Sequence, residues 1–229
     1  MLKKVTASFF LFLFLLVALP AWATLPTIEE RLNAGGIITE ISIPEAGTLA
    51  HVNVQAIINS PPIAVWQALK DIEGWPGWLP MSKTARFLSE AAESRITAEI
   101  AKNRDEVVAI DTQYPNDDHG NGGAGHWQRL AYEEYDLPWP IKNEWVVRRY
   151  TYDEGEDKSR ASWRKVDGSS TDDDGFWEVG AWKDGKTYLR YYYRVKVKKG
   201  APEPLFKAAV SLTVNSMIKA LRREAKRRL

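Results

Sequence analysis

The sequence predicts an α+β domain in which a curved antiparallel β-sheet wraps around a long C-terminal helix. Two observations predict it. Between residues 83 and 198, short β-like runs alternate with turn residues. Beyond Pro204, apolar residues recur at helical spacing and form one continuous stripe. Because a half-buried sheet needs a cover and an amphipathic helix needs an apolar partner, we expect the helix to lie on the sheet.

The N-terminal segment has the pattern of a secretory signal peptide. Lys3 and Lys4 precede an unbroken apolar run over residues 9–19, and Ala21-Trp22-Ala23 supplies the small-residue cleavage pattern. The run is shorter than the roughly 20 apolar residues that a helix needs to cross a bilayer, although a retained anchor is the alternative. We expect residues 1–23 to be removed, the mature chain to begin at Thr24, and the protein to be periplasmic or secreted.

The charge balance excludes one large class of partner. The chain has 31 Lys and Arg against 30 Asp and Glu, and loss of the two N-terminal lysines leaves 29 against 30. A nucleic-acid-binding domain needs a clear basic surplus, so no nucleic-acid partner is expected. The absence of Cys excludes disulfides and thiolate chemistry. The 10 Trp and 9 Tyr suit a thick core or an apolar cavity.

The chain is expected to form one domain over residues 47–229, because it has no internal repeat and no linker long enough to divide it. Residues 24–46 are an N-terminal extension packed on that domain. Within the extension, Thr27 is placed to cap a short helix and residues 37–43 form an extended run.

The domain itself opens with one strand followed by two short helices. Apolar residues at every second position of 52–58 predict a strand with one buried face. Ser60 as N-cap, with Pro61 at the first helical position, predicts the first helix. Residues 71–80 then form a short helical turn that Gly and Pro end.

Eight further strands are expected, joined by Asp-Gly and Gly-rich turns into an antiparallel meander. In the clearest of them, Leu189, Tyr191 and Tyr193 alternate with charged or polar residues, so one face is apolar and the other is wet. The predicted strands cover residues 83–88, 95–102, 106–114, 127–135, 145–152, 161–166, 176–182 and 188–198.

The C-terminal helix supplies the cover for this sheet. About 20 helical residues span about 30 Å, enough to cross a whole domain. Its apolar stripe consists of Phe206, Val210, Thr213, Val214, Met217 and Leu221.

Several motifs occur along the chain in the order in which a known superfamily has them. They are IINSPPIAVW at 57–66, a Leu-x-Asp and Trp-Pro-x-Trp-Leu-Pro pattern at 69–80, Pro-Trp-Pro at 138–140 followed by Asn-Glu-Trp-Val at 143–146, and Pro-x-Pro-Leu-Phe at 202–206. Together they resemble the START and polyketide cyclase-like superfamily (SRPBCC), close to its bacterial START-domain and coenzyme Q-binding-like proteins. Asn143 and Glu144 depart from the family pattern, since they stand where Arg and Asp are usual.

The resemblance implies the helix-grip fold, with a tunnel between the sheet and the C-terminal helix that takes a hydrophobic ligand. On that basis the expected function is to bind, and to carry or sense, a lipid, quinone or sterol-like molecule. The alternative is a cyclase- or hydrolase-like enzyme acting on an apolar or aromatic substrate in the same cavity. A carrier needs one or two orienting polar groups inside, whereas an enzyme needs a coupled acid and base.

The candidate ligand-binding residues are aromatic and apolar side chains that can face inward from helix and sheet. They are Trp66, Trp145, Trp163, Trp177, Tyr191, Tyr193, Phe206, Val210 and Met217.

No catalytic residue and no cofactor are expected. No nucleophile has an evident activating partner, and neither a Gly-x-Ser-x-Gly nor a phosphate-binding Gly-rich motif is present. If the protein has chemistry, the candidate acids and bases are Asp111, Glu144, Arg148 and Glu178, each of which an ion pair or an exposed position also explains.

No metal site is expected either. Asp117, Asp118 and His119 lack the spacing of a strong metal site, and the Gly-rich loop 115–125 around them is either a lid over the cavity or a surface loop. Asp172-Asp173-Asp174-Gly175 is predicted to be a solvated hairpin turn and not a calcium loop.

The C-terminal segment 222–228 is basic. It either touches anionic lipid headgroups transiently or complements the negative end of the helix dipole. The sequence makes no prediction of oligomeric state.

Overall fold

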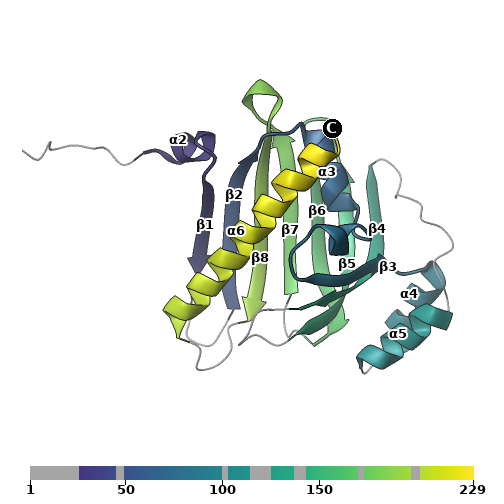
Figure 1. Cartoon of the computed structure of the whole chain (residues 1–229). Helices are drawn as coiled ribbons and strands as arrows, with labels where there is room; N and C mark the ends of the chain where they lie inside the picture. The colour runs from purple at the N-terminus through teal and green to yellow at the C-terminus, as the bar shows by residue number, and fades with distance from the viewer. Residues whose placement is uncertain are drawn as a thin grey trace, which may run out of the picture.

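The computed structural model describes residues 26–44, 49–99, 103–113, 125–136, 143–169, 173–196 and 202–229. Its strands are β1 (Ile37–Ser42), β2 (Leu49–Ile58), β3 (Ser82–Phe87), β4 (His126–Tyr135), β5 (Glu144–Glu154), β6 (Lys158–Gly168), β7 (Asp173–Ala181) and β8 (Thr187–Lys196). They form one antiparallel sheet in the order β1-β2-β8-β7-β6-β5-β4-β3. Figure 1 shows the long helix α6 (Glu203–Arg227) lying diagonally across this curved sheet. The predicted fold class is confirmed.

The concave face of the sheet and the inner face of α6 share one core. Strand β8 has the predicted alternation, with Leu189 fully buried and Tyr191 and Tyr193 packed on the core. From α6, Val214, Ile218 and Leu221 join the same core, each at most 1% exposed. The hydrophobic effect therefore fixes both the side of the helix and the face of the sheet.

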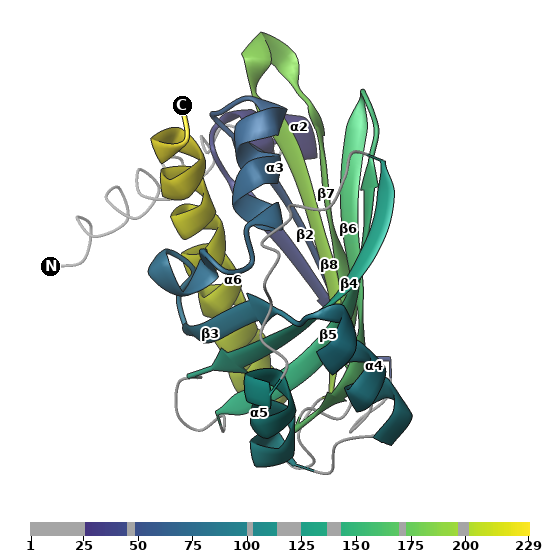
Figure 2. The same ribbon diagram turned by 90° about the vertical axis from the view of Figure 1, so that its right-hand side faces the viewer.

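A short helix after β2 packs beside α6 (Figure 2). This helix, α3 (Pro62–Lys70), is followed by the 3-10 turn η1 (Trp75–Gly77). Its N-cap is Pro61, one residue later than the predicted Ser60. The Ser60 hydroxyl, the group that would cap the helix, instead donates to the carbonyl oxygen of Asn59 at 2.9 Å, while the Ser60 carbonyl oxygen accepts from the buried Thr187 hydroxyl of β8 at 2.7 Å.

The predicted N-terminal extension supplies a helix and an edge strand. Thr27 caps α2 (Ile28–Asn33) through a capping box with Glu30, as its position predicts. Strand β1 pairs along β2, and Leu32 and Ile38 pack against Ile57 on the convex side. Residues 1–23 lie outside the described residues, so signal-peptide cleavage stays a prediction. Within the described ranges, no helix has the length and apolarity to span a membrane.

Two helices lie on the convex face where strands were predicted. Residues 95–102 and 106–114 were predicted to be strands, but the structure has α4 (Glu90–Glu99) and α5 (Arg104–Gln113), so that prediction is wrong. Both helices lie near β3 and β4 (Figure 2). They begin at side-chain caps, because Ser89 accepts from the Ala92 amide and Asn103 accepts from the Glu106 amide.

These helices bury a second, smaller core against the outside of the sheet. Ala92, Ile96 and Val107 pack with convex-facing residues of the sheet, and the spacing of Ala92 and Ile96 is helical. The sheet side of this cluster consists of Leu130, Tyr132 and Val147, with Trp145 partly buried beside them. Tertiary packing on this face therefore decided between strand and helix.

The C-terminal end of α6 is tied to α3 by a buried carboxylate. Glu224 is 3% exposed and accepts from Arg227 at 2.9 Å and from Arg228 at 2.7 Å. Arg228 also donates to Asp71 at 2.5 Å, just beyond α3. Arg222 donates to the carbonyl oxygen of Ile57 at 2.9 Å. Three of the basic residues expected to face a membrane or the helix dipole therefore bind groups of the protein itself.

Glu224 should make stability depend on acid. Hydrogen bonds from Arg227 and Arg228 hold the pKa of Glu224 below its usual range. A lowered folded-state pKa gives stability that is present above the unfolded-state pKa and lost as pH falls through the folded-state pKa. Glu224→Gln should cost about 1–3 kcal/mol near neutral pH and less in acid, as measured by urea unfolding across pH. An equal loss at all pH values would contradict the electrostatic explanation.

Candidate functional site

Most of the predicted ligand-binding residues meet on the concave face. Trp163 on β6, Trp177 on β7 and Tyr191 on β8 form a ring cluster, with Trp177 and Tyr191 stacked at 3.9 Å between centroids. Tyr193 continues the stack at 5.0 Å from Tyr191. Trp66 enters the same core from α3 and is 2% exposed. The strands thus present a continuous aromatic surface toward α6.

The three predicted residues of α6 close the other side. Val210 and Met217 are 8% and 9% exposed and belong to the same core, while Phe206 is partly buried against it. They lie on the predicted stripe. Eight of the nine candidate residues therefore surround one interior.

Trp145 does not belong to that interior. It lies on β5 three residues from Arg148, so the two side chains point to opposite faces of the sheet. Trp145 packs on the convex cluster instead. Its predicted inward position is wrong, because the residues of β5 that face inward are those at even positions, such as Tyr150 and Tyr152.

A polar cluster is embedded in the aromatic concave face. The Arg148 guanidinium on β5 donates through Nε to Asp173 Oδ2 on β7 at 2.7 Å and through Nη2 to the same oxygen. Its Nη1 donates to Glu133 on β4 and to the Tyr135 hydroxyl at 2.8 Å. Glu133 is fully buried, and the side chains of Arg148 and Asp173 are each 13% exposed.

Aromatic donors complete this Arg148 cluster. The hydroxyls of Tyr135 and Tyr150 both donate to Glu133, the latter at 2.8 Å. Trp163 Nε1 donates to the second oxygen of Asp173 at 2.9 Å. Burial raises the pKa of Glu133, while Arg148 and the two hydroxyls act in the opposite direction. The cluster is therefore a coupled set of buried charges and not a single ion pair.

The position of Asp173 corrects the sequence prediction. Asp173 and Asp174 were expected in a solvated hairpin turn, but they are the first residues of β7. Alternation then sends Asp173 to the concave face and Asp174 to the other face, where it accepts from Arg194 at 2.6 Å. Because Asp173 lies in a run of three aspartates, the sequence pattern indicated a solvated turn and not a residue of the interior site.

The other acid and base candidates separate by face. Arg148 lies in the buried cluster, and Glu144 lies half-buried near it, where burial and the neighbouring Asp173 raise the pKa of Glu144. Glu178 pairs with Lys158 at 3.0 Å on the convex face. The side chain of Asp111 lies outside what the structure describes. Glu133 and Tyr135 were not predicted, since nothing in the local sequence distinguishes them from surface residues of a strand.

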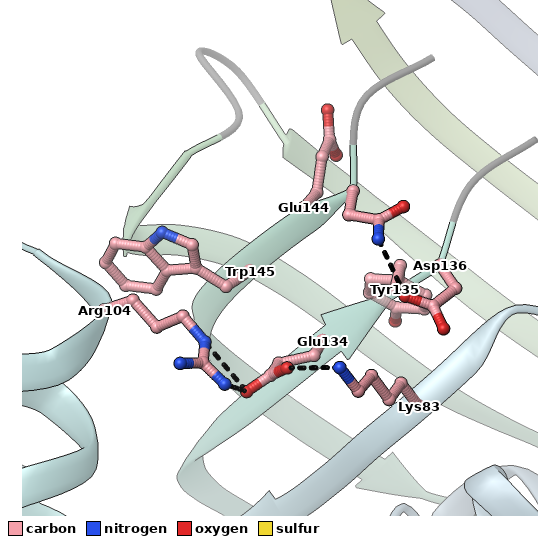
Figure 3. A pocket seen from close by; sticks show the side chains of 8 residues that line it. Lys83, Arg104, Glu134, Tyr135, Asp136, Glu144 and Trp145 are labelled. Atoms are coloured by element: carbon pink, nitrogen blue, oxygen red, sulfur yellow. Dashed lines mark hydrogen bonds and ion pairs between the residues drawn. The ribbon is translucent and has the colours of Figure 1, made fainter. Parts of the chain in front are cut away.

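A pocket of about 320 Å³ lies at the ends of β4 and β5. Figure 3 shows Arg104 and Lys83 on either side of Glu134, with Trp145 above them and Asp136 and Glu144 across the pocket. Arg104 donates to Glu134 at 2.7 Å. The complete lining is Lys83, Arg104, Glu134, Tyr135, Asp136, Asn143, Glu144 and Trp145.

Tyr135 connects the pocket to the interior. It lines the pocket, and its hydroxyl belongs to the buried Arg148 cluster. Glu144 is its direct partner across the β4–β5 pair. Trp145 lines this pocket from the convex side and not the predicted interior.

Among the described residues, three buried polar atoms in or against this interior have no hydrogen-bond partner: Trp66 Nε1, Trp78 Nε1 and the Tyr152 hydroxyl. The rings of Trp66 and Tyr152 lie 6.0 Å apart edge to face. An unmet buried donor costs about 1–3 kcal/mol, so such an atom is normally paired with water or a ligand.

A family model described as polyketide cyclase / dehydrase and lipid transport matches residues 58–222 of the chain. The match includes α3, most of the sheet, the Arg148 cluster and nearly all of α6. The chain belongs to this family. No curated protein matches the chain by sequence.

Solved structures of an aromatase/cyclase and of STAR-related lipid transfer proteins share the fold. A STAR-related lipid transfer protein from Xanthomonas axonopodis has a TM-score of 0.57 at 15% identity, over 83% of this chain and 94% of that one. The Zhui aromatase/cyclase from Streptomyces sp. R1128 has 0.53 at 14%, over 79% and 95%. Human STARD10 has 0.54 at 11%, over 90% and 82%. At these identities the likeness shows the fold alone.

Metal binding finds no support in the described part of this family member. No group of three His, Cys, Asp or Glu side chains there could hold a metal ion. Asp117, Asp118, His119 and most of the Gly-rich loop 115–125 lie outside the described residues, so the alternatives for that loop stay open.

Proposed function

We propose that this protein binds a hydrophobic small molecule, such as a lipid, quinone or sterol-like compound, between the sheet and α6 and acts as its carrier or sensor. The observation that carries the proposal is the Arg148 cluster, a small polar group set within an otherwise aromatic and aliphatic concave face. Ligand sites for apolar molecules have this composition, with few polar groups that orient the ligand.

The unpartnered donors of the interior support the same proposal. Trp66 Nε1 and the Tyr152 hydroxyl lie on the concave side, away from the Arg148 cluster along β5. A ligand oxygen or a bound water would meet their hydrogen-bonding capacity. A ligand that has polar atoms toward both ends of an apolar body fits this arrangement.

The alternative function is that of a cyclase- or hydrolase-like enzyme. Glu133 favours it, because a buried carboxylate with a raised pKa can act as a general acid or base. Against it, both oxygens of Glu133 already accept hydrogen bonds from Tyr150, Tyr135 and Arg148. The carrier proposal needs no free acid or base. Turnover of an aromatic polyketide-like substrate that Glu133→Gln abolishes would favour the enzyme.

The test is ligand uptake observed from inside the protein. Native mass spectrometry of protein purified from its own host should find a co-purified apolar molecule. Adding that molecule to the emptied protein should change tryptophan fluorescence. Trp163→Phe should reduce the change, because Trp163 lies on the concave face. Trp182→Phe is the matched control, since Trp182 stacks on Tyr188 on the convex side, beside Leu32, Ile38 and Ile57. An empty protein with unchanged fluorescence after lipid exposure would contradict the proposal.

Export and membrane contact are further parts of the proposal. The N-terminal pattern at 1–23 supports function outside the cytoplasm, and mass analysis of the exported form should place its first residue at Thr24. Arg223 and Lys226 are exposed on α6 and could meet anionic headgroups transiently. Sedimentation with anionic vesicles, compared with neutral ones, would test that contact.

A further inference from the structure

The charge balance of the site indicates which polar end the ligand has. We infer that this end is a hydrogen-bond donor without negative charge, a hydroxyl or an amine, and not a carboxylate or a phosphate. The inference rests on the proposed function, and it follows from groups that the fold has already paired around Arg148.

Arg148 has no free fork for an incoming anion. Proteins usually hold a carboxylate or phosphate by two parallel N–H donors of one guanidinium. Here Nε and Nη2 both donate to Asp173, and Nη1 donates to Glu133. An anionic ligand would have to displace one of these protein carboxylates.

Carboxylates also outnumber cations at this place. Glu133, Asp173 and Glu144 lie near two cations, Arg148 and Lys165, both of which lower the pKa of Glu144. The pocket beside Tyr135 has the same excess, since Glu134, Asp136 and Glu144 accompany Lys83 and Arg104. Adding another buried negative charge would be costly, whereas a donor would relieve the excess.

One carboxylate is available to such a donor. Glu144 makes no hydrogen bond or ion pair with another described residue, although it is half-buried. It lines the pocket beside Tyr135, its direct neighbour across the strands. Burial and Asp173 raise the pKa of Glu144, whereas the charges of Arg148 and Lys165, which do not hydrogen-bond to it, act in the opposite direction. A hydroxyl or ammonium group that reaches Tyr135 would find in Glu144 a carboxylate with no hydrogen bond to another described residue.

The test compares ligands that differ only in their polar end. Dodecanol below its solubility limit, and dodecylamine and laurate below their micelle concentrations, are titrated into the protein near neutral pH while tryptophan fluorescence is followed. Dodecanol and dodecylamine should bind about tenfold or more tightly than laurate. Equal or tighter binding of laurate would overturn the inference and leave the proposed function standing. Failure of all three to bind would count against the proposed function itself.

Two variants assign the selectivity to this cluster. Glu144→Gln and Asp173→Asn each remove one carboxylate. Each should therefore reduce the ratio of the affinity for dodecylamine to the affinity for laurate, here called the affinity gap, about threefold or more. Glu178→Gln is the control, because Glu178 pairs with Lys158 on the convex face and should leave the gap unchanged. If Asp173→Asn unfolds, Glu144→Gln decides, since Glu144 makes no hydrogen bond or ion pair with another described residue that the substitution would remove. An unchanged gap in Glu144→Gln would overturn the assignment.

Discussion

Arg148→Met is expected to lower the free energy of unfolding by about 3–5 kcal/mol. Removing the guanidinium leaves Glu133 fully buried and Asp173 largely buried, with no cation hydrogen-bonded to either. Breaking a buried pair costs more than the pair is worth, because the remaining charges keep their desolvation penalty. Urea unfolding near neutral pH would measure the loss.

The same substitution predicts a pH dependence. Burial raises the pKa of Glu133 in the folded state, and loss of Arg148 should raise it further. A raised folded-state pKa gives stability that is present below the unfolded-state pKa and lost as pH rises through the folded-state pKa. The free energy of unfolding of Arg148→Met should therefore be close to that of the wild type in acid, and the difference between them should grow as pH rises.

Two controls test whether the loss of stability in Arg148→Met arises from the burial of the remaining charges. Arg194→Met breaks the Arg194–Asp174 pair of the convex face, whose side chains are 40% and 29% exposed, and should cost less than about 1 kcal/mol. Adding Glu133→Gln and Asp173→Asn to Arg148→Met should recover much of the loss. A decrease in the free energy of unfolding of less than about 1 kcal/mol for Arg148→Met alone would show that the charges of the Arg148 cluster are not shielded from water.

The sequence predicts those parts of the fold whose pattern repeats locally. The stripe of α6 was predicted correctly because Val210, Val214 and Met217 follow the helical period and have no competing period. The alternation of Leu189, Tyr191 and Tyr193 predicted the face of β8 for the same reason. Both patterns were long enough for the period to be unambiguous.

The convex helices show where local patterns fail. Residues 106–114 contain Val107, Val108 and Ile110, which favour a strand by residue type, yet they form α5. The caps at Ser89 and Asn103, each followed by acidic residues in the first turn, were the available signal for helices. Packing on Leu130 and Tyr132, which the local sequence does not reveal, favoured the helix over the strand.

The polar site could be predicted only in part. Arg148 and Glu144 were candidates, but Glu133 and Asp173 come from strands on either side of β5 and β6 and meet Arg148 through the sheet order. Trp145 was misplaced because one residue of register moves every side chain to the other face. Local sequence patterns and packing thus determine the fold, whereas the residues of the site are brought together by the pairing of strands that lie far apart in the sequence.

Truncation along α6 should separate packed core from ligand contact. Leu221→Ala and Ile218→Ala should each cost about 2–5 kcal/mol, because both side chains are fully buried near α3 and the removed atoms leave a cavity. Val210 and Met217 are slightly exposed, at 8% and 9%, and lie on the stripe that faces the aromatic surface. If they border ligand space, Val210→Ala and Met217→Ala should cost on the order of 1 kcal/mol.

Ligand binding shows whether a small loss of stability at Val210 and Met217 means that these side chains border ligand space or belong to a packed core. In a ligand site, Val210→Ala and Met217→Ala enlarge the space available, so they should shift the affinity for an apolar probe or the preferred chain length of dodecanol and its homologues. Leu212→Ala is the matched control on α6, since Leu212 is 71% exposed and should change neither stability nor binding. Losses at Val210 and Met217 as large as that at Leu221, with probe binding unchanged, would show a solid core beneath the helix, and the carrier proposal would fail.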